Sequence, residues 1–265
     1  MNPSPPVVLI LLLMGGFFAR PARAADSGQP TTAADIVARA TALNGLGFDN
    51  GRARVRMVLQ DATGTRKERS LEARSMKENG LARTAIRFLA PPEVLGSAFL
   101  LLERAGSEPD DMHLYLPALK RTRRISGNQK EGAFMGSDFS YADMENRDIK
   151  AAAYTSKPDA DVDGVACLVI DAQPTSTEQP YGRIEIFIRK DNFLIQQLKF
   201  HDKSEVLLKV YRLHEFKAVE GHLLATKSQM WTKADSHTTF LFLDEVDTKT
   251  PTSPADFTPD ALSKG

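Results

Sequence analysis

The chain has 265 residues with 34 basic and 34 acidic side chains, so its formal net charge is zero. A general nucleic-acid binder needs an excess of positive charge, and the balance argues against that class of protein. A composition of 42% hydrophobic and 26% charged residues is typical of a folded globular chain and excludes wholesale disorder. The single cysteine, Cys167, excludes an intramolecular disulfide and a thiolate metal cluster.

The N-terminal segment predicts export. Residues 7–19 form an apolar run that is shorter than the roughly 20 residues a membrane-spanning helix needs. The run is followed by Ala-Arg-Ala at residues 22–24, a small-x-small pattern typical of a signal-peptidase site. We therefore expect residues 1–24 to be a signal peptide and residues 25–265 to form one domain, and an uncleaved anchor is the alternative.

Residues 32–44 predict a helix because apolar side chains recur there at helical spacing. These side chains are Ile36, Val37, Ala40 and Leu43. Thr32, with Asp35 three residues later, fits a capping box, and Gly45 is expected to end the helix.

The rest of the chain alternates apolar and polar residues with the period of two that is typical of half-buried strands. Turn signals recur at about ten-residue spacing, which indicates an antiparallel meander. The fold class expected is mainly β (α+β), with about ten or eleven strands in a curved sheet or incomplete antiparallel barrel. The concave face of such a sheet needs a cover, and the candidates are the helix and residues 127–145.

Two sets of apolar residues share a face by this period of two, and we predict that they line one apolar interior. A solid core is the alternative interpretation. The first set is Ile86, Phe88, Leu100, Leu102, Leu114 and Leu116. The second set is Ile184, Ile186, Ile188, Leu198 and Phe200.

Residues 127–145 combine flexible glycines with large apolar side chains. The glycines are Gly127, Gly132 and Gly136, and the large side chains are Phe134, Met135, Phe139 and Tyr141. Ser140, with Asp143 three residues later, fits a capping box for a short helix from Tyr141. One interpretation is a static plug at the open end of the sheet. The other is a lid over an apolar cavity that is mobile in the free protein and becomes ordered over a ligand.

A basic cluster precedes this segment and consists of Lys120, Arg121, Arg123 and Arg124. Such a cluster fits a solvated strand edge. It also fits docking to anionic headgroups or to an acidic partner.

Chemical motifs are sparse. The five histidines are scattered, and none has the i, i+4 spacing of a zinc-binding helix. Residues 159–164 read Asp-Ala-Asp-Val-Asp-Gly, but the twelfth position of a calcium loop would be Ile170 rather than the required Glu. We expect no catalytic site, no metal and no cofactor, and a hydrolase with an unrecognised site is a remote alternative.

Three segments, residues 87–100, 111–126 and 134–144, resemble the LolA-like outer-membrane lipoprotein-sorting protein family, and the resemblance extends over roughly residues 32–262. It implies an incomplete antiparallel barrel capped by helices around a cavity for acyl chains. It further implies a periplasmic carrier or accessory protein whose partners are a lipid or lipidated protein, an inner-membrane transporter and, transiently, a membrane surface. The arginine–carbonyl latch attributed to LolA has no assigned position in this chain. An adaptor that docks on an envelope transporter and binds no lipid is the alternative.

Overall fold

The computed structural model describes residues 32–43, 50–105, 108–145, 152–175, 180–219 and 222–264. The expected signal peptide, residues 1–24, lies outside these ranges. None of the helices in the described ranges has the length and hydropathy needed to cross a membrane.

Thirteen antiparallel strands form one open sheet, in the order β6-β5-β4-β3-β2-β1-β15-β14-β11-β10-β9-β8-β7. The bounds in the first half are β1 (Gly51–Gln60), β2 (Arg66–Glu78), β3 (Leu81–Ala90), β4 (Ala98–Leu102), β5 (Asp111–Leu116) and β6 (Arg121–Ile125). Those in the second half are β7 (Ala152–Val162), β8 (Val165–Pro174), β9 (Arg183–Arg189), β10 (Ile195–His201), β11 (Leu207–Leu213), β14 (Lys227–Thr232) and β15 (His237–Asp247). A separate hairpin pairs β12 (Phe216–Val219) with β13 (His222–Ala225).

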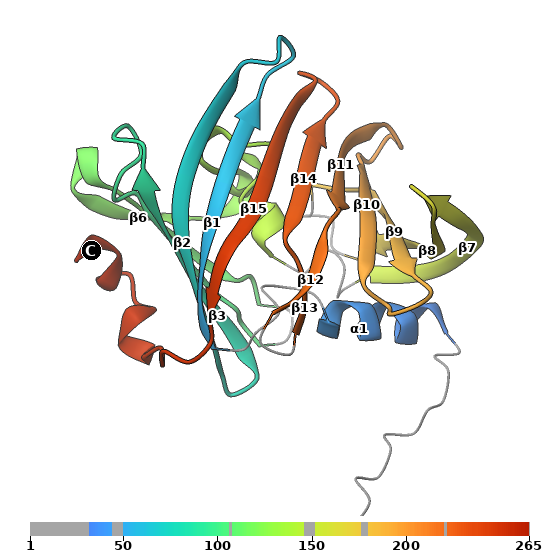
Figure 1. Cartoon of the computed structure of the whole chain (residues 1–265), viewed down its shortest axis with the longest axis horizontal. Coiled ribbons are helices and arrows are strands. Elements are labelled where there is room, and N and C mark those ends of the chain that lie inside the picture. The colour runs from blue at the N-terminus through green and yellow to red at the C-terminus, as the bar shows by residue number, and fades with distance from the viewer. Residues whose placement is uncertain are drawn as a thin grey trace, which may run out of the picture.

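The two halves of the chain meet in the middle of the sheet, where β1 pairs with β15. Each half then runs outward strand by strand, so that β6 and β7 form the two edges. The chain between β6 and β7 must therefore pass from one edge to the other. This topology places residues 127–145, hereafter the covering segment, against one face of the sheet; Figure 1 shows strands β1, β15 and β14 in front and the green covering segment behind them.

The expectation of a mainly β, open antiparallel sheet is confirmed, but the number of strands is higher than the expected ten or eleven. The additional strands include β6 and β7, which are polar and form the two edges of the sheet. Their exposed or edge positions do not require alternating apolar residues, so the period of two is weak there. The expected cover by helices is reduced to α1 (Ala33–Leu43) and short 3-10 turns in the part of the chain that the structure describes.

The helix α1 begins as expected, because the backbone amide of Asp35 donates to Thr32 Oγ1 over 3.2 Å. The backbone amide of Thr32 donates in return to Asp35 Oδ2 over 3.2 Å, which completes the capping box. Val37 and Ala40 are buried in the main core. Figure 1 shows α1 below the strands of the second half of the sheet. The expected stop at Gly45 lies outside the described residues.

The inner face of the sheet, against which the covering segment packs, carries the main apolar core. In β9 every second residue is a fully buried isoleucine, Ile184, Ile186 and Ile188, because a strand presents alternate residues to one face. In β4 the residue opposite Ile86 and Leu114 is Phe99. Phe99, not its neighbours in β4, therefore belongs to the inner face.

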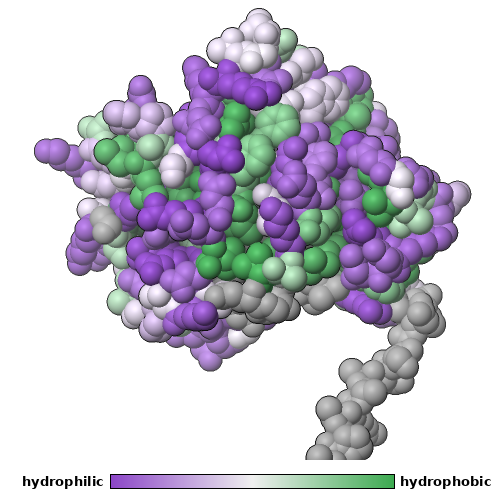
Figure 2. All heavy atoms as spheres, viewed as in Figure 1, coloured by the Kyte–Doolittle hydropathy of each residue, from purple (hydrophilic) through white to green (hydrophobic). Residues whose placement is uncertain are grey.

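The outer face carries a second, smaller core. Here the C-terminal turns place Phe257 and Leu262 against Ala98 and Leu100. Figure 2, in the orientation of Figure 1, shows apolar side chains interspersed with hydrophilic ones over the front of the sheet. The outer face is thus mixed in character, whereas the inner face is continuously apolar apart from a few polar groups described below.

Candidate functional site

The covering segment inserts aromatic side chains into the inner face. Phe134 is 1% exposed, and its ring centroid lies 5.3 Å from that of Phe99, 6.0 Å from Phe88 and 5.6 Å from Tyr141. Phe139 packs edge-on against Tyr211 with ring centroids 5.7 Å apart. These contacts join the covering segment to β3 and β4 on one side and to β11 on the other. The covering segment therefore fills the concave side of the sheet with its own side chains.

The aromatic side chains are carried by a short finger of antiparallel backbone, residues 132–141. The amide of Phe134 donates to the carbonyl of Phe139 over 2.6 Å, and the amide of Tyr141 donates to the carbonyl of Gly132 over 3.1 Å. The finger turns through Met135 and Gly136, both in the left-handed region with φ of 52° and 72°. Glycine adopts that region readily, which explains why a glycine stands at position 136 in this turn.

Polar groups hold the tip of the finger. The Arg69 side chain in β2 donates a hydrogen bond to the backbone carbonyl of Met135. Asp138 Oδ2 lies 2.6 Å from His237 Nδ1 and accepts a hydrogen bond of 2.6 Å from Thr239 Oγ1, and both partners are in β15. The amide of Asp138 also donates to Thr239 Oγ1. The tip is therefore attached to β2 and β15 through side-chain contacts, and the Asp138 side chain at their centre is only 2% exposed.

Buried ion pairs hold the base of the covering segment. Lys209 in β11 forms an ion pair with Asp143, and the two side chains are 9% and 3% exposed. Asp143 also accepts hydrogen bonds from the Tyr181 hydroxyl over 2.6 Å and from the backbone amide of Ser140 over 2.7 Å. Lys130 Nζ lies 2.6 Å from Glu145 Oε1, with side chains 14% and 5% exposed. The base is thus fixed inside the protein.

The Arg69 contact gives the first prediction. Arg69→Met retains an aliphatic side chain but removes the donor to the Met135 carbonyl, which we expect to loosen the tip with only a small loss of overall stability, about 1 kcal/mol. Hydrogen exchange should rise at residues 134–139 and stay unchanged in β9. Arg54→Met, on an exposed side chain of β1, is the control. Unchanged exchange at the tip would show that the aromatic packing alone holds the finger.

The structure brings together nine of the eleven residues predicted to line an apolar interior. Those in or packed against the main core are Ile86, Phe88, Leu114, Leu116, Ile184, Ile186, Ile188, Leu198 and Phe200. The prediction of one shared face is wrong for Leu100 and Leu102, which pack against the C-terminal turns on the outer face. The run from Ala98 to Leu102 is apolar at every position, so its pattern could not indicate which residues face inward.

The four residues predicted to form a lid lie together: Phe134, Phe139 and Tyr141 are buried, and Met135 packs against the same core. The predicted pairing of Ser140 with Asp143 is confirmed, because the Asp143 amide donates back to Ser140 Oγ over 3.3 Å. The expected short helix is a single 3-10 turn, Ala142–Met144.

The basic cluster does not act as one surface. Arg124 forms an ion pair with Asp111, which Arg104 also contacts. Arg123 lies beside the Tyr141 hydroxyl and so belongs to the surroundings of the covering segment. Among the described residues, Lys120 and Arg121 form no ion pair, and they are the part of the cluster that remains available to a partner.

The ion pairs of Asp111 with Arg104 and Arg124 predict that the stability of the fold depends on pH. Burial raises the pKa of the Asp111 carboxyl, but the Arg104 and Arg124 guanidinium groups outweigh burial and hold that pKa below its ordinary value. Such a group stabilises the fold above its unfolded pKa of about 4, and this contribution is lost as the pH falls through the folded pKa. We expect Asp111→Asn to be less stable at neutral pH and to lose less stability on acidification, measured by urea unfolding across the acidic range. Parallel pH curves for parent and variant would contradict this.

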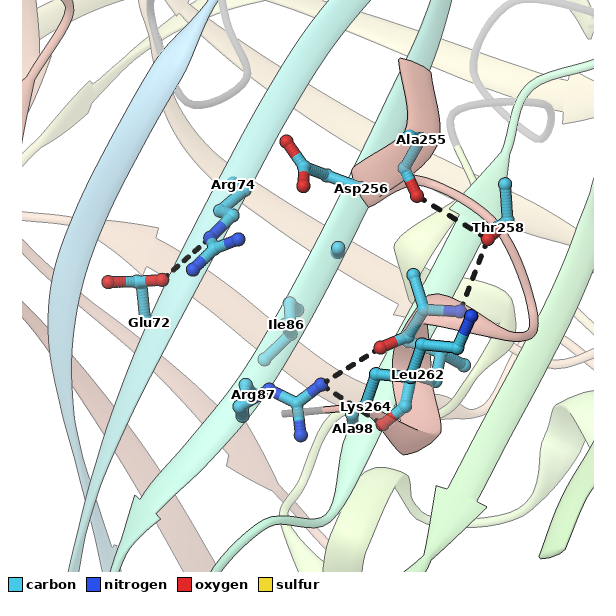
Figure 3. A pocket seen from close by; sticks show the side chains of 12 residues that line it. Glu72, Arg74, Ile86, Arg87, Ala98, Ala255, Asp256, Thr258, Leu262 and Lys264 are labelled. Atoms are coloured by element: carbon cyan, nitrogen blue, oxygen red, sulfur yellow. Dashed lines mark hydrogen bonds and ion pairs between the residues drawn. The ribbon is translucent and has the colours of Figure 1, made fainter. Parts of the chain in front are cut away.

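A pocket of about 330 Å³ lies on the outer face, between the sheet and the C-terminal turns. Figure 3 shows Arg74 and Glu72 at one end, joined by an ion pair, and Arg87 at the other. Arg87 donates to the carbonyl of Leu262 over 3.0 Å and so anchors the C-terminal turns. Arg74 is paired with Glu72, and Arg87 is held by backbone carbonyls of the C-terminal turns, so we assign the pocket to the attachment of the C-terminus.

Sequence reasoning missed four of the polar groups that hold the covering segment, namely Arg69, Asp138, Lys209 and His237, and it paired Asp143 only with Ser140. A lysine in β11 beside aromatic residues gives no local signal of burial, and its partner lies 66 positions away. No group of three or more His, Cys, Asp or Glu side chains that could hold a metal ion occurs in the described ranges.

The sequence matches one family model, and the structure is similar to several solved structures. A family model described as "Uncharacterized protein" matches residues 80–264. The structure is similar to a domain assigned to outer membrane lipoprotein sorting from Vibrio parahaemolyticus, with a TM-score of 0.80, 26% identity and coverage of 87% of this chain and 98% of that one. It is also similar to a DUF1329 family protein from Desulfovibrio piger, with a TM-score of 0.80, 25% identity and coverage of 87% and 97%.

A third solved structure, a LolA superfamily protein from Nitrosomonas europaea, has a TM-score of 0.69 and 16% identity, and the match covers 87% of this chain and 99% of that one. This likeness shows the fold alone. No curated protein matches the chain in sequence. The sheet has the LolA-superfamily fold, as the resemblance implied, although it is not closed into a barrel.

Proposed function

We propose that this chain, which belongs to the "Uncharacterized protein" family whose model matches residues 80–264 and has the LolA-superfamily fold, is a periplasmic carrier of acyl chains. Its cargo would be a lipid or the lipid part of a lipoprotein, taken up on the inner face of the sheet and handed on during outer-membrane sorting. An inner-membrane transporter is the donor that such a role requires. The proposal includes no catalytic step.

The observation that carries this proposal is the way the inner face is covered. A single segment supplies Phe134, Phe139 and Tyr141 to an otherwise continuous apolar surface. Its tip is held by hydrogen bonds to Arg69 and to β15, whereas its base is held by buried ion pairs. If the tip swings out about its base, the apolar surface that these rings covered becomes available to acyl chains, which have the same chemical character.

The polar tethers stabilise the closed state, so they add to the free energy of opening. A hydrogen bond that involves a charged group contributes about 1.5–3 kcal/mol net, and the tethers involve the charged groups of Arg69 and Asp138. Opening therefore costs the tip contacts as well as the exposure of the aromatic rings. An acyl chain that replaces the rings removes the penalty of exposing apolar surface, so binding and opening are coupled.

Mass spectrometry of the protein purified from its native compartment without detergent tests the proposal. We expect copurified molecules with acyl chains, and we expect more of them with Phe134→Ala, which enlarges the space on the inner face. Phe257→Ala, which opens space on the outer face, is the matched control. Protein free of acyl lipid in all three forms would contradict a carrier.

The second candidate is an adaptor that docks on an envelope transporter and binds no lipid. The observation that favours it is the nearly complete burial of Phe134, which fits a permanent plug as well as a closed lid. An adaptor would bind its transporter equally well when the covering segment is fixed. A disulfide between the finger and β15 that left transporter binding intact and showed no effect on lipid content would support it.

A further inference from the structure

Two leucine side chains project into solvent at one end of the sheet. Leu95 is 55% exposed and Leu119 is 59% exposed, and they are the two most exposed large apolar residues in the described ranges. Leu95 lies in the turn that joins β3 to β4, and Leu119 lies in the 3-10 turn Pro117–Leu119 that joins β5 to β6. Exposed leucines scattered singly need no explanation, but two on adjoining turns form a surface.

The two turns support each other and hold the leucines outward. The β3–β4 turn returns to the sheet through a hydrogen bond from the Gly96 amide to the Phe88 carbonyl over 2.9 Å. Gly96 has a φ of 77°, and a side chain there would meet Pro117 at 3.3 Å, so the turns touch at this point. Val94 packs into the main core while its neighbour Leu95 points away from it. The exposure of Leu95 is therefore set by an ordered turn.

Positive charge borders the leucines. Lys120 and Arg121 follow Leu119 directly, both are exposed, and neither forms an ion pair among the described residues. Lys120 has a left-handed backbone conformation and its amide donates to the Pro117 carbonyl over 3.0 Å, which closes the turn. Glu93 is the one carboxylate on the two turns, so the surface carries a net positive charge.

The same end of the sheet holds the tip of the covering segment. The last residue of β3, Ala90, pairs with Ser70 in β2. The neighbouring residue in β2, Arg69, contacts the Met135 carbonyl at the turn of the finger. At the opposite end, α1 lies below the second half of the sheet (Figure 1). The exposed leucines thus lie on the side from which the finger would leave the inner face.

We infer that Leu95, Leu119, Lys120 and Arg121 form a membrane-docking surface for an anionic lipid bilayer. The leucines enter the boundary between headgroups and acyl chains, and the two cations bind anionic headgroups, a combination typical of interfacial membrane binding. This inference rests in part on the proposed function, because docking at this end would place the finger next to the bilayer. An acyl chain could then pass between the membrane and the inner face with little exposure to water.

Cosedimentation of the full mature chain with lipid vesicles tests the inference. Vesicles of phosphatidylethanolamine and phosphatidylglycerol supply an anionic surface, and phosphatidylcholine vesicles supply a neutral one. One variant, Leu95→Ser/Leu119→Ser, removes the apolar contacts, and a second, Lys120→Gln/Arg121→Gln, removes the charges. The control, Lys217→Gln/Leu223→Ser, removes one exposed lysine and one exposed leucine from the β12–β13 hairpin.

We expect the parent to bind anionic vesicles and to bind neutral vesicles much more weakly. The charge variant should bind anionic vesicles about thirtyfold less tightly and show a smaller dependence on salt. The leucine variant should bind at least about tenfold less tightly at every salt concentration. The control should bind like the parent, and thermal melting should show that all four forms are equally folded, since the changed side chains are exposed.

Three results would overturn the inference. One is a parent that does not bind anionic vesicles, and another is a control that loses as much binding as the two test variants. The third is a leucine variant that keeps full vesicle binding but loses self-association in sedimentation, which would make the surface a contact between copies of the chain. Vesicle binding without copurified acyl lipid would reject the carrier and support the docking surface. Copurified acyl lipid without vesicle binding would support the carrier and reject the docking surface.

Discussion

Replacing Lys209 by Met is expected to lower the free energy of unfolding by about 3–5 kcal/mol, because it leaves the Asp143 carboxylate buried without its counterion. The Lys209 ammonium group also lies 5.2 Å from the centroid of the Tyr181 ring and 5.6 Å from that of Phe200, so it has little access to water. The hydrogen bonds from Tyr181 and Ser140 to Asp143 remain in the variant, but neither of them neutralises the charge.

Urea unfolding measures this effect, and the double variant Lys209→Met/Asp143→Asn provides its control. The Asn side chain keeps hydrogen-bonding groups for Ser140 and Tyr181 but carries no charge, so the double variant should recover most of the lost stability. If Lys209→Met lowers the free energy of unfolding by less than about 1 kcal/mol, the ion pair does not hold the base of the covering segment. A double variant no better than the single one would assign the loss to packing.

Phe134→Ala is expected to lower the free energy of unfolding by less than the burial of this side chain suggests. Truncating a fully buried phenylalanine costs about 3–5 kcal/mol when the surrounding structure does not collapse into the space. If the finger leaves the inner face part of the time, Phe134 is buried only in the closed state, and the loss is limited to the free energy that separates closed from open. We therefore expect Phe134→Ala to cost clearly less than Phe257→Ala, whose side chain is equally buried at 1% exposed.

The same pair of variants should differ in ligand binding. With Phe134→Ala, less ring surface competes with an acyl chain, so titration with a fluorescent fatty acid should show tighter binding. Phe257→Ala should bind like the parent, since it changes only the outer face. Equal unfolding losses for the two variants, together with no fatty-acid binding by either, would identify Phe134 as an ordinary core residue.

The elements whose signal is local could be predicted from the sequence. The capping box of Thr32 and Asp35 and that of Ser140 and Asp143 are both present, because each depends on residues three positions apart. The isoleucines of β9 were placed on the inner face by their alternation with polar residues. Where alternation is lost, as in Ala98–Leu102, the choice of face was wrong for Leu100 and Leu102. The sheet order there, not the local pattern, decides which residues are inside.

The polar contacts of the candidate site could not be predicted, because they join residues that are distant in the chain. Arg69 and Met135 lie 66 positions apart, and Asp138 and His237 lie 99 positions apart. Each of these residues taken alone is indistinguishable from a solvated surface residue. Only the passage of the covering segment from one edge of the sheet to the other brings them together.

The packing also changes the expected behaviour of the covering segment. Its glycines led to the expectation of a lid that is mobile in the free protein and becomes ordered over its ligand. In the structure the rings of the finger occupy the inner face themselves, so a ligand on that face competes with them for the same surface. We therefore propose the opposite order, in which the finger is closed in the free protein and is displaced when an acyl chain binds.

Hydrogen exchange across residues 127–145, with and without a long-chain fatty acid, tests this account most directly. In the free protein the amides of Phe134 and Tyr141 donate hydrogen bonds within the finger and should be protected. The fatty acid should lower their protection, leave the amides of Asp143 and Glu145 at the fixed base protected, and leave β9 unchanged. Protection of Phe134 and Tyr141 that equals that of β9 both with and without the fatty acid would contradict the carrier, because a finger that never opens cannot expose the inner face to cargo.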